Sequence, residues 1–399
     1  MNNKLFLSAA AFLSAGYINL ASATEFEFRG NIELQGRIFT EQALFPTQED
    51  EAFSLAFAPE FYWSWNNGDD SIEFVPSYRV DQHDDERTHG DVRELAWVHV
   101  GDDWESRIGV RRVFWGVTEF QHLVDIINQS DSVEDIDNED KLGQPMINLS
   151  LVRDWGIIDF YVLPYFRERT FAGPEGRPGI PIIDTDNAFY QSSDEQDHID
   201  YAVRWTHSID DYEIGVSVFD GTSREPILVP TNPFDPNTTL TPLYIQITQF
   251  GLELQANIED SLWKLEMVHN QNDLEDYWAL QGGIEYSQYG VFDSNADLGW
   301  LVEYGWDERG DDGPSNFQND IFFGNRLALN DVDSTELLFG LSYDLDFEST
   351  SVLVEASRRF GDSIKVSLDV RLFESDDPAD PIYLFRRDDH IQVTAQYYF

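Results

Sequence analysis

The chain has 399 residues, and 75 Asp and Glu against 25 Lys and Arg give it a formal net charge of −50. A field of this sign excludes nucleic acid and anionic phospholipid surfaces as partners. The absence of cysteine fits an exported protein that needs no disulfides, and the aromatic content of 14% suits two girdles at the interfaces of a membrane barrel.

The N-terminal segment predicts export. Lys4 precedes a largely apolar run over residues 5–20, and Ala21-Ser22-Ala23 forms an A-x-A cleavage site. We therefore expect residues 1–23 to be a cleaved signal peptide and residues 24–399 to form a single barrel domain. No later stretch reaches the run of about 18 apolar residues that a spanning helix needs, so a membrane-embedded mature chain must cross with strands.

Strict alternation then runs through the chain in segments long enough for tilted membrane strands. In residues 25–39 the apolar side chains Phe26, Phe28, Ile32, Leu34 and Ile38 alternate with polar and charged ones. Residues 52–66 and 363–373 repeat the pattern. An apolar face outward and a charged face inward is what lipid outside and water inside demand.

The fold class predicted is all-β, a transmembrane antiparallel up-and-down barrel of about 18 strands, with 16 as the alternative. Connections alternate between short periplasmic turns and long acidic outer loops, with both termini periplasmic. The strands are expected at 25–39, 52–66, 71–82, 91–101, 104–115, 146–153, 156–166, 199–208, 211–219, 244–257, 262–270, 277–288, 297–306, 321–329, 334–345, 351–360, 363–373 and 389–399.

The last strand carries its own signal. Ile391, Val393, Ala395, Tyr397 and Phe399 face one way and polar residues mostly face the other. This ending resembles the closing strand that outer-membrane β-barrels present to the barrel assembly machinery. The resemblance implies that Tyr397 and Phe399 form the assembly signal.

Acidic residues gather in the expected outer loops. These acidic loops have two interpretations. They form a solvated surface that divalent cations bridge to lipopolysaccharide, or they form a channel mouth that concentrates cations. Residues 131–140 also offer several carboxylates to a hard cation such as Ca²⁺, although the glycine and spacing of an EF-hand are missing. No other cofactor is expected.

Basic residues are mostly Arg, and several lie on the polar face of strands. They predict a lattice of ion pairs along the wall, or a transverse field that selects polar solutes. The pore-lining candidates are Arg29, Arg37, Arg79, Arg107, Arg111, Arg204, Arg326, Arg359, Arg371, Glu303 and Glu355.

Residues 116–145 form the third outer connection and are too long for a simple hairpin. Their apolar side chains, such as Phe120, Leu123 and Ile127, predict packing back into the barrel. In position and character the segment resembles the constriction loop of general porins. The constriction candidates are Glu119, His122, Asp125, Asp131, Glu134, Asp135 and Asp137.

The passage from Arg112 to Glu119, with Trp115-Gly116 at its centre, continues into Asp125-Ile-Ile-Asn128. It is similar to a strand-to-loop junction in an uncharacterised porin-like family of Gram-negative outer-membrane proteins, a domain of unknown function. Residues 163–171 also fit such a barrel. The resemblance implies an outer-membrane location in contact with lipid and lipopolysaccharide, and little about a solute.

An enzyme is not expected, because His99, His207 and His269 lie in no recognisable Ser or metal-ligand constellation. We expect a porin-like channel for passive passage of small polar or charged solutes. Two alternatives stay open: an export conduit for an anionic polymer, and a non-conducting surface barrel whose acidic loops bind a partner. An open or shut lumen at residues 116–145 discriminates them. A homo-oligomer is also left open.

Overall fold

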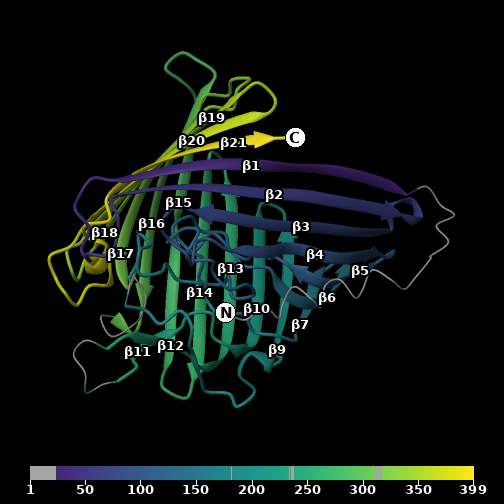
Figure 1. Cartoon of the computed structure of the whole chain (residues 1–399). Helices are drawn as coiled ribbons and strands as arrows, with labels where there is room; N and C mark the ends of the chain where they lie inside the picture. The colour runs from purple at the N-terminus through teal and green to yellow at the C-terminus, as the bar shows by residue number, and fades with distance from the viewer. Residues whose placement is uncertain (1–23, 181, 233, 235–237, 311–312, 314–316) are drawn as a thin grey trace.

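The computed structural model describes residues 24–180, 182–232, 234, 238–310, 313 and 317–399. The predicted signal peptide, residues 1–23, lies outside the described residues. Eighteen strands form one antiparallel sheet, and each pairs with its neighbours along the chain. In Figure 1 the strands β1 to β4 cross in front of β13 to β16, with connecting segments between the two walls.

The barrel strands have these bounds: β1 Glu25–Phe39, β2 Glu51–Trp65, β3 Asp70–Asp81, β4 Gly90–Val100, β5 Trp104–Arg111, β6 Gln144–Arg153, β7 Gly156–Leu163, β9 Asp200–Ile209, β10 Tyr212–Thr222, β13 Gln246–Ile258, β14 Ser261–Asn272, β15 Asp276–Val291, β16 Ala296–Asp307, β17 Asn319–Ala328, β18 Glu336–Asp344, β19 Thr350–Phe360, β20 Ile364–Glu374 and β21 His390–Tyr398.

Short helical turns occur only in connections of the described chain: η2 (Asn66–Gly68), η3 (Glu195–Asp197) and η5 (Pro381–Phe385). None of the helices in the described residues is long and apolar enough to span a membrane.

The first and last strands close the sheet into a ring. β1 pairs with β2 on one side and with β21 on the other, from Asn31 opposite Tyr398 to Phe39 opposite His390. Phe399 extends this ladder, because its N–H and carbonyl both bond to Gly30 at 3.1 Å. A closed ring leaves no free strand edge, which is what a barrel in lipid requires.

The outer surface of the ring is apolar and the inner surface is polar. On β1, Phe28 and Leu34 are 50% and 58% exposed, whereas Gln35 and Arg37 on the other face are 7% and 4% exposed. This pattern is the reverse of a soluble barrel, and it gives lipid an apolar wall to contact.

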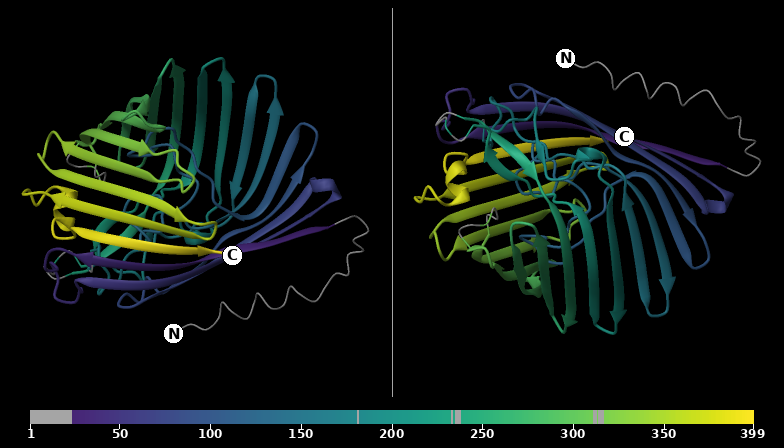
Figure 2. Two further views of the ribbon diagram at one scale, coloured as in Figure 1. Left: turned by 90° about the horizontal axis from the view of Figure 1, so that it is seen from above. Right: turned by 90° about the horizontal axis from the view of Figure 1, so that it is seen from below.

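Long and short connections alternate between the two ends of the barrel. One end, called here the short-turn end, carries turns such as 101–103, 154–155, 210–211 and 259–260. The other, the long-loop end, carries 40–50, 112–143, 164–199, 223–245 and 375–389. Figure 2 shows the barrel from above and from below, with hairpin turns joining successive strands. Two connections at the long-loop end, 273–275 and 345–349, are themselves short.

All eighteen predicted strands are present, so the alternative of 16 is wrong. Predicted and observed bounds agree within three residues except where 104–115 was expected. β5 ends at Arg111 because the next backbone amides bond to side chains instead of a strand backbone: Arg112 donates to Glu94 Oε1 and Val113 donates to Asn128 Oδ1, both at 2.8 Å. β7 ends at Leu163 because Pro164 has no N–H for a sheet ladder.

The long-loop end contains a second sheet that the sequence did not predict. β12 (Leu240–Tyr244) pairs antiparallel with β11 (Ile227–Pro230) and parallel with β8 (Phe189–Tyr190). β11 and β12 are short and contain Pro, and β8 has only two residues, so none of the three gives a clear alternation.

Shortening the chain at Phe399 tests the closure. The Phe399 ring lies 5.5 Å from Phe28 and 6.1 Å from Phe57, and two aromatic contacts of this kind contribute about 1–3 kcal/mol. We expect deletion of Phe399 to reduce the fraction of protein that migrates as the heat-modifiable folded form on gels. Phe53→Ala is the control, since Phe53 lies on the same outer face without a ring contact among the described residues. Equal folding of both variants contradicts the closure argument.

Candidate channel interior

Residues 112–143, called the inserted loop, leave β5 and fold back into the ring instead of extending from it. Their apolar side chains are buried in the lumen: Trp115 is 1% exposed and Val124 and Ile127 are fully buried. They pack with wall residues such as Tyr161 and Phe219 in one apolar cluster. Burial of this apolar surface holds the loop inside the barrel.

Glu266 of β14 anchors the first half of the loop through backbone amides. Its Oε1 accepts from the N–H groups of Val117 and Thr118 at 2.7 and 3.0 Å and from the Thr118 hydroxyl at 2.6 Å. Its Oε2 accepts from the N–H of Val124 at 3.2 Å. A buried loop needs acceptors for its amides, and a carboxylate is a strong one.

Glu303 of β16, two strands further along the wall, also accepts from backbone amides of the loop. It accepts from the N–H groups of Glu119 and Phe120 at 2.9 and 3.2 Å, and from the Gln281 amide at 2.9 Å. The Phe120 ring stacks on Phe322 of β17 with centroids 4.7 Å apart. These contacts fix residues 117–124 against the wall from β14 to β17.

The second half of the loop binds the opposite part of the wall through ion pairs. Asp131, fully buried, lies 2.6 Å from Arg93 Nη2 and accepts from the Thr170 hydroxyl at 2.7 Å. Glu134 lies 2.7 Å from Arg79 Nε. These arginines belong to β4 and β3.

Asp135 and Asp137 bind a third strand. Both carboxylates contact Arg371 Nη2 of β20, at 3.4 and 2.8 Å. The inserted loop therefore contacts β3, β4, β14, β16, β17 and β20, and it crosses the lumen from one wall to the other.

His122 and Asp125 lie at the centre of the loop. His122 Nε2 is 3.1 Å from Glu139 and its Nδ1 is 3.8 Å from Glu266. Burial disfavours the charged ring, but these two carboxylates outweigh it and raise the pKa of His122 to about 10. Burial raises the pKa of Asp125, against the opposing effect of Lys141 at 3.1 Å.

The predicted pore-lining residues occupy three environments. Arg37, Arg79, Arg371 and Glu303 are buried by contact with loops or wall. Arg107, Arg111 and Arg204 are partly buried and lie beside Glu105, Glu94 and Glu253 respectively. The more exposed ones are Arg29 beside Glu60, Arg326 beside Glu119, Arg359 over the Tyr398 ring, and Glu355 4.0 Å from Arg371.

The seven loop candidates come together in the lumen, but the sequence reasoning missed most of their partners. Glu266, Arg87 and Arg93 are not among the residues that the sequence singles out. No local signal distinguishes a lumenal glutamate that binds a loop from one that faces water, because the partners lie more than a hundred residues apart in the chain.

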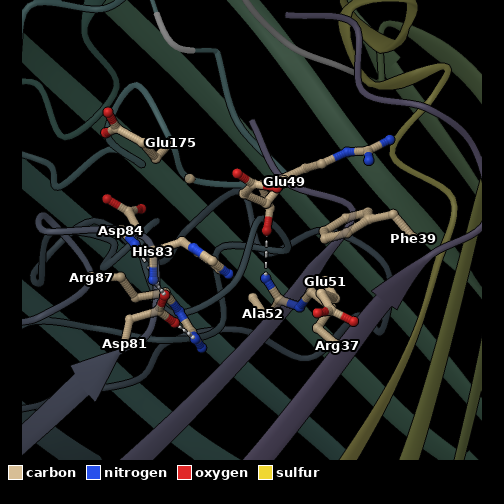
Figure 3. Close-up of a pocket in the computed structure, with 12 residues that line it drawn as sticks. Arg37, Phe39, Glu49, Glu51, Ala52, Asp81, His83, Asp84, Arg87 and Glu175 are labelled. Atoms are coloured by element: carbon tan, nitrogen blue, oxygen red, sulfur yellow. Dashed lines mark hydrogen bonds and ion pairs between the residues drawn. The ribbon is translucent and has the colours of Figure 1, made fainter. Parts of the chain in front are cut away.

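The long-loop end is tied together by Arg177, which is only 6% exposed. Its guanidinium contacts Asp388 at 2.7 Å and Asp50 at 2.8 Å, and it lies 4.2 Å above the Phe39 ring. Loop 164–199 thereby joins loops 40–50 and 375–389. Figure 3 shows the neighbouring space, where Arg87 and Asp81 form an ion pair of 2.8 Å near Arg37.

One group of side chains has the spacing of a metal site. His89, Asp131 and Glu134 each offer a ligand atom, and these atoms lie within 4.8 Å of one another. The carboxylates already bind Arg93 and Arg79. A cation there would meet two guanidinium groups, so the donor set does not fit a resident metal.

A closed ring with an apolar exterior, a charged interior and a long inserted loop defines a porin-like β-barrel of the outer-membrane type. No protein-family model matches the sequence, and no curated protein matches it.

Solved structures with a similar trace are bacterial barrels. OmpT of Vibrio cholerae, folded in vitro and described as a trimer form, has a TM-score of 0.48 and 9% identity, and the match covers 94% of this chain and 100% of that one. A mutant of the porin of Rh. blastica has a TM-score of 0.45 and 13% identity with the same coverage. The fold described above rests on the strand pairing of this chain, and these neighbours carry no statement about its solute.

Replacing Glu266 tests the anchor. In Glu266→Gln the amide group cannot accept at both positions, so one of the two sets of backbone amides loses its acceptor. A hydrogen bond to a charged group contributes about 1.5–3 kcal/mol, so we expect amide exchange to accelerate about ten- to a hundredfold either at residues 117 and 118 or at residue 124, depending on which set loses the oxygen. Glu285→Gln is the matched control on the next strand, since Glu285 contacts Lys264 and Arg326 instead of the loop backbone. Unchanged exchange in Glu266→Gln means that the loop does not depend on this carboxylate.

The raised pKa of His122 predicts a pH dependence. Its pKa is about 10 in the closed loop and 6.5 in a released one, so the stabilising charge is fully present below pH 6.5 and is lost as the pH rises to 10. The equilibrium constant for closing the loop should fall by up to about tenfold per pH unit over this window. Proteolytic cleavage of residues 112–143 at pH 7 to 10 measures it. His122→Gln should remove the slope, and a slope that persists in this variant refutes the assignment.

Proposed function

We propose that the protein is a porin-like channel of the bacterial outer membrane, through which small polar or charged solutes pass passively. One observation carries the proposal: the inserted loop crosses a closed, charged barrel and is fixed to opposite walls by charged groups. A rigid crossing segment narrows a lumen to a defined size. Ion pairs and amide bonds to buried carboxylates make this segment hard to displace.

We place the passage between the loop and the wall from β17 to β20, because the side chains on this side are the more exposed ones. The anchoring side chains Glu266 and Asp131 are fully buried, whereas side chains on this side are open to solvent. The exposed ones are Glu139 at 54%, Arg326 at 44% and Glu355 at 43%, and Asp137, although bound to Arg371, is partly exposed at 27%. Three of these four carry negative charge, which favours cations over anions.

The lumenal arginines weaken the export-conduit alternative. Most of them already bind carboxylates of the wall or the loop, as Arg79 binds Glu33 and Glu134. A polyanion would have to displace these partners at each step. The acidic surface at the long-loop end would also repel it.

A second candidate is a non-conducting surface barrel, and the long-loop end favours it. Arg177 joins three outer loops into one covering layer. If that layer closes the mouth, the acidic loops serve as a binding surface. Lipid and lipopolysaccharide would contact the apolar wall in either case, with Ca²⁺ bridging the acidic loops, and a homo-oligomer is compatible with both. The barrel assembly machinery would recognise the C-terminal strand.

Conductance of the refolded protein in a planar bilayer tests the proposal. We expect stable open steps and, under a salt gradient, a reversal potential that indicates cation preference. Neutralising the open side in Glu139→Gln/Glu355→Gln should reduce this preference, and Arg326→Gln should increase it. The matched control is Glu60→Gln, on β2, away from the loop. A barrel that inserts but stays silent supports the surface protein instead.

A further inference from the structure

A group of buried carboxylates lies on the inner wall at the long-loop end. Asp320 of β17 and Asp344 of β18 are directly opposite each other in the strand ladder, and they are 0% and 1% exposed. Both face inward, as does Phe322 of β17, which stacks on Phe120 of the inserted loop. Like charges at directly opposite positions destabilise a sheet, and burial increases the cost because water cannot screen the repulsion.

A third carboxylate comes from the outer loop 375–389. Asp380 is 2% exposed, and its oxygens accept from the Ser375 hydroxyl at 2.6 Å and from the Ile382 amide at 2.9 Å. Its charge acts on both carboxylates of the wall. The loop and the wall therefore bring three buried carboxylates into one region.

No basic side chain compensates these carboxylates. Among the described residues, no Lys, Arg or His nitrogen lies within 4.0 Å of Asp320, Asp344 or Asp380. Arg309, in the connection that follows β16, pairs with Asp307 instead, at 2.6 Å. The region differs in this respect from the inserted loop, whose contacts with the wall join carboxylates to guanidinium groups or to several backbone amides.

The unpaired polar atoms in this region are all oxygens. Asp320 Oδ1, Gln318 Oε1 and Ser349 Oγ are buried and have no hydrogen-bond partner among the described residues. The Gln318 side chain lies against Asp344, since its Nε2 donates to Asp344 Oδ2 at 2.7 Å. Ser349 adjoins the same residue, because its carbonyl accepts from the Asp344 amide at 3.0 Å. Carboxylate and neutral oxygens without donors are the ligands that a hard cation prefers.

A bound ion of this kind needs no separate cavity. Ca²⁺ binds oxygens at about 2.3–2.6 Å, whereas a water molecule approaches an oxygen at about 2.7–2.8 Å. Oxygens that surround a calcium position therefore have no surface open to water. Asp380 does not lie within 4.8 Å of both other carboxylates, so it would contact the ion through a water molecule, as one ligand of an EF-hand often does.

We propose that Asp320 and Asp344 bind a Ca²⁺ ion, with neutral side-chain oxygens from Gln318 and Ser349 and with Asp380 linking the outer loop to the wall. The ion would supply the counter-charge that these buried groups lack. The site shares no residue with the acidic run of the inserted loop. It goes beyond the proposed channel function, because binding requires only the folded barrel.

Isothermal titration calorimetry of the refolded full chain in detergent micelles tests the site. The probe is CaCl₂, added after removal of metals with EDTA, in about 0.3 M KCl so that exposed carboxylates are screened. We expect saturable 1:1 binding, which Asp320→Asn/Asp344→Asn weakens about a hundredfold or more and Asp380→Asn about tenfold, because ligand charge sets the affinity of such sites. Asp376→Asn, which changes an exposed carboxylate of the same loop, should leave binding unchanged.

A second measurement separates binding from folding. The double variant loses two opposed charges, so it should fold, and heat-modifiable migration checks this. Ca²⁺ should slow amide exchange in the outer loop about tenfold or more in the unchanged protein and leave it unaltered in the double variant. Equal Ca²⁺ affinity of these two proteins overturns the site. Absence of saturable binding in the unchanged protein also overturns it, and means that the two wall carboxylates share a proton instead.

Discussion

The structure depends on one constraint: the backbone of a segment folded into the lumen must find hydrogen-bond partners there. Residues 117–124 form no strand, so their amides cannot be satisfied by a neighbouring ladder. Glu266 and Glu303 supply the acceptors from the wall. Each carboxylate is in turn stabilised, because several donors offset the cost of burying its charge. Loop and wall therefore stabilise each other, and neither arrangement is favourable alone.

The second half of the loop is also held by polar contacts with the wall, but the charged groups are exchanged. Here the loop supplies the carboxylates and the wall supplies the guanidinium groups, as in Asp131 with Arg93 and Asp137 with Arg371. A chain with a net charge of −50 thus places much of its scarce positive charge at the contacts that need it. The acids left over lie in the outer loops and along the open side of the lumen. The excess of acidic over basic residues therefore underlies both the ion pairs that hold the loop and the proposed preference for cations.

The fold could be predicted from the sequence because lipid imposes a period of two on every strand. That rule is local, so it identified all eighteen strands and the direction in which Arg37 and Phe28 face. It failed where the backbone bonds to something other than a strand, at residues 112–115, and where strands are too short to alternate, as in β8. The insertion of the loop was predictable from its apolar residues. The partners of Glu266 were not, since a contact across 148 residues leaves no local pattern.

The Trp115-Gly116 pair combines a local backbone requirement with contacts to distant parts of the wall. Trp115 is buried against Tyr161, with ring centroids 5.6 Å apart, and it supports Arg204 on its other side. Gly116 has φ of +140°, and a Cβ there would lie 3.0 Å from Glu266 Oε1 and 2.9 Å from His122 Nδ1. Only glycine combines that backbone conformation with the space that the anchor needs. The same two residues turn the chain into the lumen and leave room for the carboxylate that holds it there. The path of the inserted loop is therefore set at one turn of the chain, and a side chain in place of Gly116 must displace either the Glu266 carboxylate or the loop.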